Sequence, residues 1–258
     1  MKKDAVKSIW NANAEFWDKR MGEGNDFHKT LIEPNQLKFL NIKPGQKILD
    51  IACGNGQFAR KMAELGAQVT AVDFSDKFIE IAKAKSSKEI EFKVIDATKI
   101  KDLKTLGSHK YNAAVCTMAL MDMENIEILT KYLPQLLKKN GVFVFSILHP
   151  CFNSGENVLL HERDDLGGKI KDRYAVKVSN YLLEKSYLGV GMSGQPEPQY
   201  YFHRPISTIL GYCFKNGLVL DGMVEPSFPM EKLNGALWRD VFTHIPAAIV
   251  CRLRPIGE

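Results

Sequence analysis

The chain has 258 residues, of which 45% are hydrophobic and 25% are charged, and its formal net charge is +5. These proportions are typical of a globular protein, and no apolar run approaches the roughly 20 residues that a membrane-spanning helix needs. The lysines are spread along the chain rather than gathered into one block, which argues against a nucleic-acid interface. We therefore expect one elaborated soluble domain that binds neither membrane nor nucleic acid.

The N-terminal stretch "MKKDAVKSIW" contains basic residues but no apolar segment after them. This pattern does not fit a secretory signal, so we expect a cytoplasmic protein. The cysteines are odd in number, widely scattered and without a C-x-x-C pair, so we predict reduced thiols and no metal site. They are Cys53, Cys116, Cys151, Cys213 and Cys251.

An aromatic stripe marks residues 1–42. Trp10, Ala14, Trp17 and Met21 recur at steps of three and four residues, which predicts an amphipathic helix. This segment either covers a cleft as an N-terminal helical cap or packs on the domain as an ordinary helix. In the first case Trp10 and Trp17 would belong to a substrate pocket.

Strand-like and helix-like segments alternate from Gln46 to about Phe145, which predicts βαβ units and a parallel sheet with helices on both faces. The predicted strands are nearly continuous apolar runs, as buried parallel strands are. Two predicted helices have apolar stripes at helical spacing, made of Phe58, Met62 and Leu65, and of Ile126, Leu129, Leu133 and Leu136. Gly66 and Gly141 are predicted to end these helices.

The character of the chain changes at residues 149–204, which are rich in Gly, Pro and Tyr and lack the alternating rhythm. A structureless loop of that length is uncommon, so we expect an inserted cap that folds on its own or closes over a site. Within it, "RYAVKVSNYLLEKSYL" predicts one or two added strands. In residues 205–258, "PISTILGYCFKNG" predicts a last helix, and "LVLDGMVE" and "PAAIVCRLR" predict strands that complete the sheet.

A small-residue turn in "LDIACGNGQFAR" follows the first predicted strand. Gly54 and Gly56 allow a tight turn that brings backbone N–H groups close to a ligand at a helix N-terminus. A dinucleotide fingerprint would have a third glycine where Ala59 stands, and Asp50 precedes the turn. A carboxylate there repels a diphosphate and attracts an ammonium or sulfonium group.

Two further acids end the next two predicted strands. Asp73 is placed to accept hydrogen bonds from a ribose diol, and Asp96, followed by the small Ala97, to accept one from an adenine amine. Because the carboxyl ends of parallel strands share one edge of a sheet, these acids and Asp50 should meet where such folds bind ligands.

These segments resemble the class I S-adenosylmethionine-dependent methyltransferases over about residues 43–148. "ILDIACGNG" is similar to their first motif, "VTAVDFS" and "VIDA" to the acidic ends of their second and third strands, and "YNAAVCTMAL" to their fourth strand. The resemblance implies S-adenosylmethionine as cofactor, S-adenosylhomocysteine as product, and a doubly wound, mostly parallel seven-stranded sheet whose last hairpin inserts an antiparallel strand. It assigns the methionyl end to Ala52, Cys53, Gly54 and Gly56, with Asp50 supporting the loop, the ribose to Asp73, adenine to Phe74, Asp96 and Ala97, and the sulfonium surroundings to Thr117 and Met118.

Candidates for acceptor chemistry follow the predicted fifth strand. His149 leaves the strand at the ligand edge and could act as a general base, although it could equally shape the insertion by hydrogen bonding. His203 and Arg204 end the insertion and could reach an acidic or carbonyl acceptor, or could simply pack at the surface. Tyr201 and its aromatic neighbours could form a wall of the pocket.

The sequence thus favours a methyltransferase acting on a small molecule by direct in-line transfer, as a monomer or homodimer. An NAD(P)-dependent oxidoreductase and a non-catalytic cofactor-binding protein stay open as alternatives. RNA or tRNA base methylation is disfavoured: Cys151 in "HPCF" resembles a covalent nucleophile, but the fourth strand lacks a Pro-Cys pair and the charge is dispersed.

Overall fold

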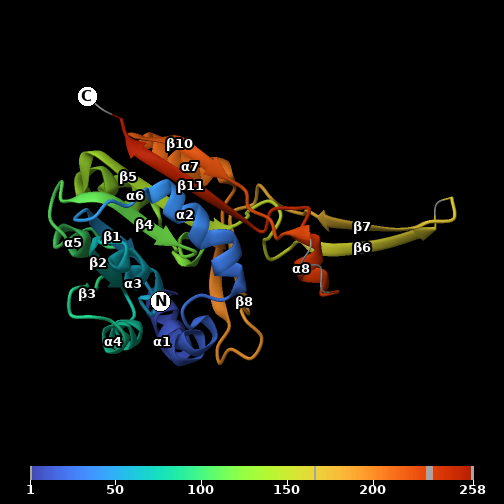
Figure 1. Ribbon diagram of the computed structural model, residues 1–258, viewed down its shortest axis with the longest axis horizontal. Helices are drawn as coiled ribbons and strands as arrows, with labels where there is room; N and C mark the ends of the chain where they lie inside the picture. Colours follow the sequence, from blue (N-terminus) through green and yellow to red (C-terminus); the bar gives the residue numbers. More distant parts are fainter. Residues whose placement is uncertain (1, 166, 231–234, 257–258) are drawn as a thin grey trace.

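Seven strands form the central sheet of the computed structural model, which describes residues 2–165, 167–230 and 235–256 (Figure 1). The strands lie in the order β10-β11-β5-β4-β1-β2-β3. They are β1 (Lys47–Ile51), β2 (Gln68–Asp73), β3 (Glu91–Val94), β4 (Tyr111–Thr117), β5 (Leu137–Leu148), β10 (Leu218–Val224) and β11 (Ala248–Pro255).

The pairing of these strands confirms the predicted sheet. Strands β1 to β5 are parallel, and β11 is antiparallel to both β5 and β10. Within this sheet, β11 therefore runs opposite to its neighbours β5 and β10. All five parallel strands end at one edge, which brings together the turns that follow β1, β2 and β4.

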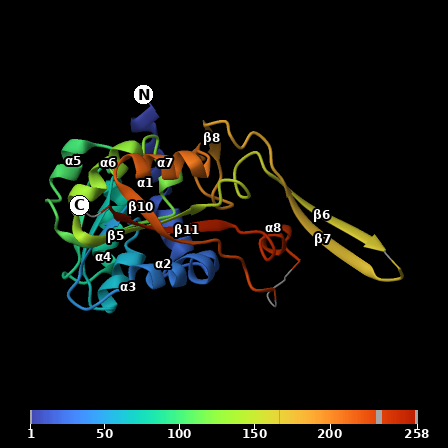
Figure 2. The ribbon, with the colours of Figure 1, turned by 90° about the horizontal axis from the view of Figure 1, so that it is seen from above.

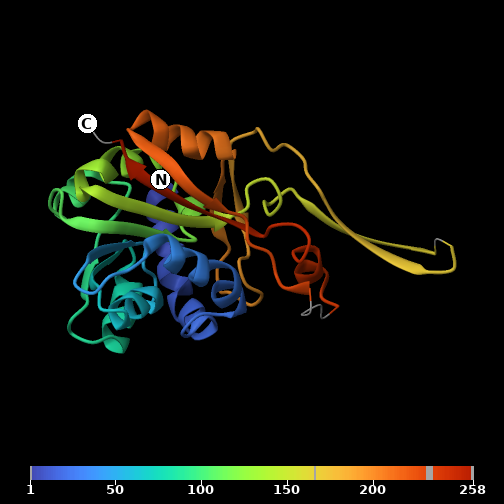
Figure 3. The same cartoon turned by 45° about the horizontal axis from the view of Figure 1, so that its top comes forward.

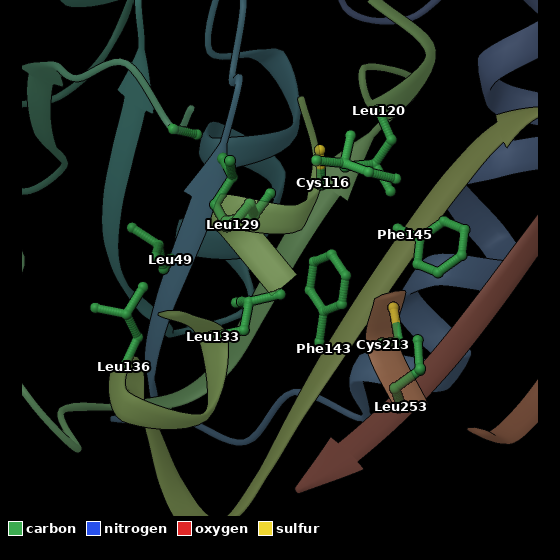
Figure 4. Packing of buried hydrophobic residues seen from close by; sticks show 14 of the residues in the cluster. Leu49, Cys116, Leu120, Leu129, Leu133, Leu136, Phe143, Phe145, Cys213 and Leu253 are labelled. Atoms are coloured by element: carbon green, nitrogen blue, oxygen red, sulfur yellow. The ribbon is translucent and has the colours of Figure 1, made fainter. Parts of the chain in front are cut away.

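Helices cover both faces of the sheet, as predicted (Figure 2). On one face lie α5 (Ile100–Lys104), α6 (Glu127–Leu136) and α7 (Ile206–Lys215), and on the other α2 (Glu33–Leu40), α3 (Gln57–Glu64) and α4 (Asp76–Lys85). Strand β1 serves both cores, because Ile48 points to the second set and Leu49 to the first. Figure 4 shows Leu49 beside Leu129 and Leu133 of α6, and Phe143 of β5 completes this packing.

The N-terminal segment forms α1 (Lys2–Met21) and a short π-helix, η1 (His28–Ile32), before α2. Helix α1 is docked on α4 by polar contacts as well as by its aromatic face. Asn11 accepts a hydrogen bond from the Ser75 hydroxyl at 2.6 Å, and Asp18 pairs with Lys85 at 2.6 Å. The helix thus lies over the turn that follows β2.

The insertion after β5 contains two hairpins outside the main sheet: β6 (Val158–Asp165) with β7 (Ile170–Lys177), and β8 (Lys185–Gly189) with β9 (Gln199–His203). The added strands predicted in this region are confirmed as β7 and β8, whereas their partners were not predicted. The β6–β7 hairpin projects away from the body, while β8 and β9 run beside the sheet edge near α1 (Figures 1 and 3). The insertion therefore consists of a projecting hairpin, β6–β7, and a hairpin close to the sheet edge, β8–β9.

Three details of the predicted elements are wrong. Helix α6 ends at Leu136 rather than at Gly141, because the chain enters β5 at Leu137 and pairs there with Tyr111. Leu65 lies past the end of α3 and is 43% exposed, so it is not part of the apolar face. Helix α7 is also not the last, since α8 (Leu237–Val241) follows β10.

The turn between β1 and α3 requires left-handed backbone at three positions: Ala52, Gly54 and Gly56 have φ values of +57°, +54° and +75°. The two glycines differ in their surroundings. A Cβ atom on Gly56 would lie 3.0 Å from the Phe92 ring and from the Ala82 Cβ, whereas one on Gly54 would meet nothing within 4 Å. Gly56 is therefore needed both for the left-handed backbone and for close packing against Phe92, whereas Gly54 is needed only for the left-handed backbone.

We predict that Gly56→Ala destabilises the fold more than Gly54→Ala does. Both changes force alanine into a left-handed conformation at a cost of about 1 kcal/mol, and only the first adds a steric clash of a further ~1–3 kcal/mol. Urea unfolding of the two variants measures the difference in the free energy of unfolding. Equal losses would show that the Phe92 contact does not constrain the turn.

Candidate functional site

A cavity of about 490 Å³ opens at the carboxyl edge of the sheet. Its floor is made by the turns after β1, β2 and β4, and α1, η1, the short 3-10 helix η2 (Leu120–Asp122) and the β8–β9 segment enclose it. The volume falls within the range of roughly 300–1,000 Å³ typical of small-molecule sites. The lining is mainly apolar and aromatic, with polar groups concentrated on the floor.

The structure brings nearly all of the predicted cofactor residues into this cavity. The predicted residues that line it are Asp50, Ala52, Cys53, Gly54, Asp73, Phe74, Asp96, Ala97, Thr117 and Met118, together with Trp10 and Trp17 of α1. Gly56 is not among them, because it stands at the start of α3 against Phe92. In the structure Gly56 packs against Phe92 instead of lining the cavity.

Several backbone N–H groups of the glycine turn are already used within the protein. The N–H of Gly54 donates to Asp73 Oδ2 at 3.0 Å, and that of Gln57 donates to Asn55 Oδ1 at 3.2 Å. The N–H groups of Cys53 and Gly56 donate to backbone carbonyls within 3.0 Å. Because these four donors are already used, the turn offers fewer N–H groups to a phosphate than its sequence suggested.

Asp50 is the most unusual polar group of the floor. It is 1% exposed, and neither carboxylate oxygen has a hydrogen-bond partner among the described residues. Burial, and secondarily the nearby Asp73, raises the pKa of Asp50 to about 8. A buried carboxyl without a partner is costly, and a cationic ligand would supply one.

Asp73 links the first two turns of the sheet. Its Oδ2 accepts from Gly54 N–H and its Oδ1 accepts from Ser75 N–H at 2.9 Å. Burial raises the pKa of Asp73 to about 6, although these backbone hydrogen bonds oppose the shift. Each carboxylate oxygen accepts more than one hydrogen bond, so capacity for a diol remains.

Asp96 lies two residues after the end of β3, beside Ala97. Its Oδ1 accepts from the N–H and the hydroxyl of Thr98, and its Oδ2 pairs with Lys99 at 3.0 Å. Partial burial would raise the pKa of Asp96, but the bonds from Thr98 and Lys99 outweigh it and lower the pKa. The group is therefore held ionised, as an acceptor for an amine.

The described lining contains no lysine or arginine, whereas it contains five acids: Asp50, Asp73, Asp96, Asp122 and Glu124. In a partly desolvated cavity this imbalance disfavours anions, which find no counter-charge, and favours cations, which would stabilise the ionised form of acids such as Asp50. The unpartnered Asp50 and the open space above Gly54 fit an adenosine ligand that carries an amino group and a sulfonium. They do not fit a dinucleotide, whose phosphates would face carboxylates.

The roof of the cavity joins α1 to the segment between β8 and β9. The side chain of Asn13 donates to the carbonyl of Glu197 at 2.8 Å and accepts from its N–H at 2.9 Å. The ring of Trp17 lies close to Gly191 on the same segment. Two parts of the chain 184 residues apart are thus joined by a paired hydrogen bond.

His149 does not line the cavity, which corrects its predicted catalytic place. Its Nε2 lies 2.8 Å from Glu225 Oε1, and its Nδ1 accepts from the N–H groups of Cys151 and Phe152. Burial lowers the pKa of His149 against the opposing effect of Glu225. Both ring nitrogens therefore fix the turn after β5, the alternative left open by the sequence.

His203 and Arg204 line a smaller neighbouring pocket rather than the main cavity. His203 Nε2 lies 2.8 Å from the Tyr181 carbonyl, and Arg204 donates to the carbonyls of Met123 and Glu124 at 2.9 and 2.6 Å. Arg204 thus braces the chain after η2 instead of facing an acceptor. Cys151 is also outside the main lining, and burial raises its pKa, which opposes thiolate formation.

Several cavity residues were missed from the sequence. Asp122 and Gln199 meet where η2 faces β9, beside Tyr201 of the predicted aromatic wall, and Trp238 enters from α8. His28 lines the cavity from η1, and neither ring nitrogen has a hydrogen bond within the described residues. Burial, with a smaller effect of Lys29, lowers the pKa of His28 to about 4, so its imidazole is neutral at pH 7.

Comparison with known proteins agrees with this geometry. Residues 49–145 match the protein family described as "Methyltransferase domain". This part of the chain is therefore similar to a methyltransferase domain. The matched segment holds the strand ends that carry Asp50, Asp73, Asp96 and Thr117, and it stops before the insertion.

Relatives and solved structures extend the likeness. A ubiquinone biosynthesis O-methyltransferase from Pelagibacter ubique is 31% identical over 154 residues, covering 56% of this chain and 61% of the relative. One of the same name from Idiomarina loihiensis is 29% identical over 147 residues, covering 54% and 58%. The chain thus spans less than two thirds of the length of these curated relatives.

Two solved structures share the fold. An S-adenosylmethionine-dependent methyltransferase from Mesorhizobium loti has a TM-score of 0.66 and 23% identity, covering 86% of this chain and 96% of the other. The 1,6-didemethyltoxoflavin-N1-methyltransferase of Burkholderia thailandensis, with bound S-adenosylhomocysteine, has a TM-score of 0.58 and 13% identity, covering 99% and 90%. At these identities the likeness concerns the fold alone.

The cysteines, the helices and the possible metal ligands were also compared with the predictions. All five cysteines are free thiols, as predicted. Within the described ranges, none of the helices combines the length and the apolar character needed to cross a bilayer. The same residues contain no group of three side chains arranged to hold a metal ion.

We predict that Asp50→Asn flattens the pH dependence of stability. Because the pKa of Asp50 is about 8 in the folded state and near 4 when exposed, the folded chain keeps a proton that the unfolded chain releases. Stability therefore falls as pH rises between these values, and asparagine removes this loss. From pH 5 to pH 8 the melting temperature of the variant should fall less than that of the wild type, by roughly 3 °C or more.

Thermal melts of the ligand-free proteins at both pH values measure this effect. Asp164→Asn, on the exposed strand β6, is the matched control and should keep the wild-type slope. Parallel slopes for wild type and Asp50→Asn would contradict the buried, proton-holding state of Asp50.

We predict that Asn13→Ala loosens the roof without unfolding the sheet. The change removes two hydrogen bonds to Glu197, each worth about 1 kcal/mol. Hydrogen exchange at the Glu197 amide should accelerate by roughly tenfold or more, while amides of β11 keep their protection. Unchanged exchange at Glu197 would mean that Asn13 does not hold the segment.

Proposed function

We propose that this chain transfers a methyl group from S-adenosylmethionine to a small-molecule acceptor. The observation that carries the proposal is the acidic cavity at the carboxyl edge, in which Asp50 is buried without a partner and no described lining residue is a lysine or arginine. Such a cavity favours an adenosine ligand with cationic groups.

The proposed division of roles follows the floor of the cavity. Asp50 attracts the cationic methionyl end, Asp73 holds the ribose, and Asp96 with Ala97 receives the adenine edge. Thr117 and Met118 are proposed to stand beside the reacting centre, where Thr117 is fixed by its hydrogen bond to Gln36 at 3.1 Å. S-adenosylmethionine, when bound, supplies an activated methyl group on a positively charged sulfur.

The chain's main contribution to such a transfer is positioning and exclusion of water. In-line displacement requires the acceptor to be held collinear with the leaving sulfur, and the positive charge disappears during the reaction. The roof of α1 and the β8–β9 segment encloses the cavity, which supports this role. Few dedicated catalytic groups are needed for a neutral acceptor.

The alternatives are less well supported. A nicotinamide-dependent oxidoreductase would bring a diphosphate to a turn in which the N–H groups of Cys53, Gly54 and Gly56 are used internally and which lies beside Asp50. A non-catalytic cofactor-binding protein would share the floor, and turnover with an acceptor distinguishes it. The relatives are named O-methyltransferases of ubiquinone biosynthesis, but the domain match ends at residue 145, before the segments that cover the cavity. We do not extend their acceptor to this chain.

We predict that S-adenosylmethionine and S-adenosylhomocysteine bind and that NADH does not, as measured by isothermal titration calorimetry. Asp73→Asn should weaken binding of S-adenosylmethionine at least tenfold, about 1.4 kcal/mol, because it removes the charge and disturbs both turns. Glu91→Gln, at the opposite end of the neighbouring strand, is the control and should bind as the wild type does. Binding of NADH in place of either sulfur nucleoside would overturn the proposed function.

A further inference from the structure

We propose that the acceptor is a small aromatic molecule that is cationic or uncharged, and that it donates a hydrogen bond to Asp122. The proposal rests on the proposed function and adds to it the chemical class of the acceptor. It excludes carboxylated and phosphorylated acceptors. It stands on the position of Asp122, on the charge of the cavity and on the rings around it.

Asp122 lies on the acceptor side of the cavity. It ends η2, which begins three residues after β4 ends at Thr117. The floor acids Asp50 and Asp73 belong to β1 and β2, so Asp122 is separate from the group assigned to the cofactor. The chain thus places one acid beyond the strand end proposed to adjoin the reacting centre.

Asp122 is enclosed by the insertion rather than by the common core. Gln199 of β9 approaches Asp122 Oδ1 with its Nε2 at 3.5 Å, and Tyr201 lies on the same strand. Met192 and Gly191 line the cavity from the preceding segment. Gln199, Tyr201, Met192 and Gly191 lie outside the matched segment of residues 49–145, whereas Asp122 lies inside it. Acceptor-specific contacts are expected from such surrounding segments.

Among the residues that the structure describes, the carboxyl of Asp122 has no cationic partner. Burial raises its pKa well above the ordinary range, and the bond from Gln199 opposes the shift only in part. No lysine or arginine in the described lining could offset the charge of an anionic acceptor, so burying an anion beside Asp122 is costly even while the raised pKa keeps that carboxyl protonated. An ammonium, amine or hydroxyl donor would instead satisfy Asp122.

The walls near Asp122 favour a flat, apolar body. Tyr201 stacks on Tyr187 with ring centroids 5.5 Å apart, and Trp17 of the roof stacks obliquely on Trp10 at the same distance. Met121 and Met192 supply adaptable apolar surface. Aromatic faces attract both other rings and cations, so they reinforce the selection made by Asp122.

The test uses three phenols that share a ring and differ in the charge of a short side chain: tyramine (cationic), 4-ethylphenol (neutral) and 3-(4-hydroxyphenyl)propionate (anionic). Binding of each is measured by calorimetry on full-length protein saturated with S-adenosylhomocysteine, so turnover is not required. We expect tyramine and 4-ethylphenol to bind at least tenfold more tightly than the propionate, because the anion meets Asp122 without a counter-charge. Loading with S-adenosylhomocysteine is verified first, and its failure overturns the proposed function itself.

The role of Asp122 is tested with Asp122→Asn, compared with Glu127→Gln, an exposed acid at the start of α6 outside the cavity. Asp122→Asn should weaken tyramine at least tenfold and bring the propionate to within about threefold of 4-ethylphenol, with S-adenosylhomocysteine affinity retained. Glu127→Gln should reproduce the wild-type order.

Several results would overturn this inference while leaving the proposed function intact. They are tightest binding of the propionate, binding of none of the three phenols to loaded protein at millimolar concentration, or an unchanged charge order in Asp122→Asn. If Asp122→Asn does not fold, the charge order of the wild-type protein decides.

Discussion

The carboxylate of Asp73 is the contact on which the site depends. By accepting from the N–H groups of Gly54 and Ser75, it ties the turn after β1 to the turn after β2. The same bond consumes a backbone donor that a phosphate would otherwise use. A single buried acid therefore fixes the shape of the floor and sets its preference against anionic ligands. The left-handed backbone of the glycine turn serves this contact by bringing Gly54 N–H to the carboxylate.

This arrangement has an energetic cost in the ligand-free protein. Asp50 and Asp73 are both buried, and burial raises the pKa values of both. Within the described residues, neither carboxylate forms a hydrogen bond with a lysine or arginine. Keeping a buried acid unpaired costs stability that better-packed apolar residues would not. A cationic ligand recovers part of that cost, which makes the instability of the empty floor a source of ligand selectivity.

The floor could be predicted from the sequence, and the roof could not. Asp50, Asp73 and Asp96 follow apolar strand runs, and parallel topology alone brings such strand ends together. The Asn13–Glu197 pair joins residues 184 positions apart, and no local pattern marks either one. Asp122 stands in a short 3-10 turn without periodicity, so nothing separated it from an ordinary surface acid. The sequence did not decide the role of His149, because a histidine at a strand end can either take part in catalysis or stabilise the following turn. Its contacts with Glu225 and with two backbone N–H groups favour the second role.

The division between floor and roof has a consequence for specificity. Strand ends of the parallel core supply the floor, and changing them would disturb the sheet that both faces of helices pack on. Helix α1 and the β8–β9 hairpin supply the roof, and they join the core mainly through side-chain contacts such as Asn11 with Ser75 and Asn13 with Glu197. Residues of the roof can therefore change without altering the floor. The surroundings of Asp122 that the roof supplies, at Gln199 and Tyr201, can therefore diverge while the charge of the floor stays the same.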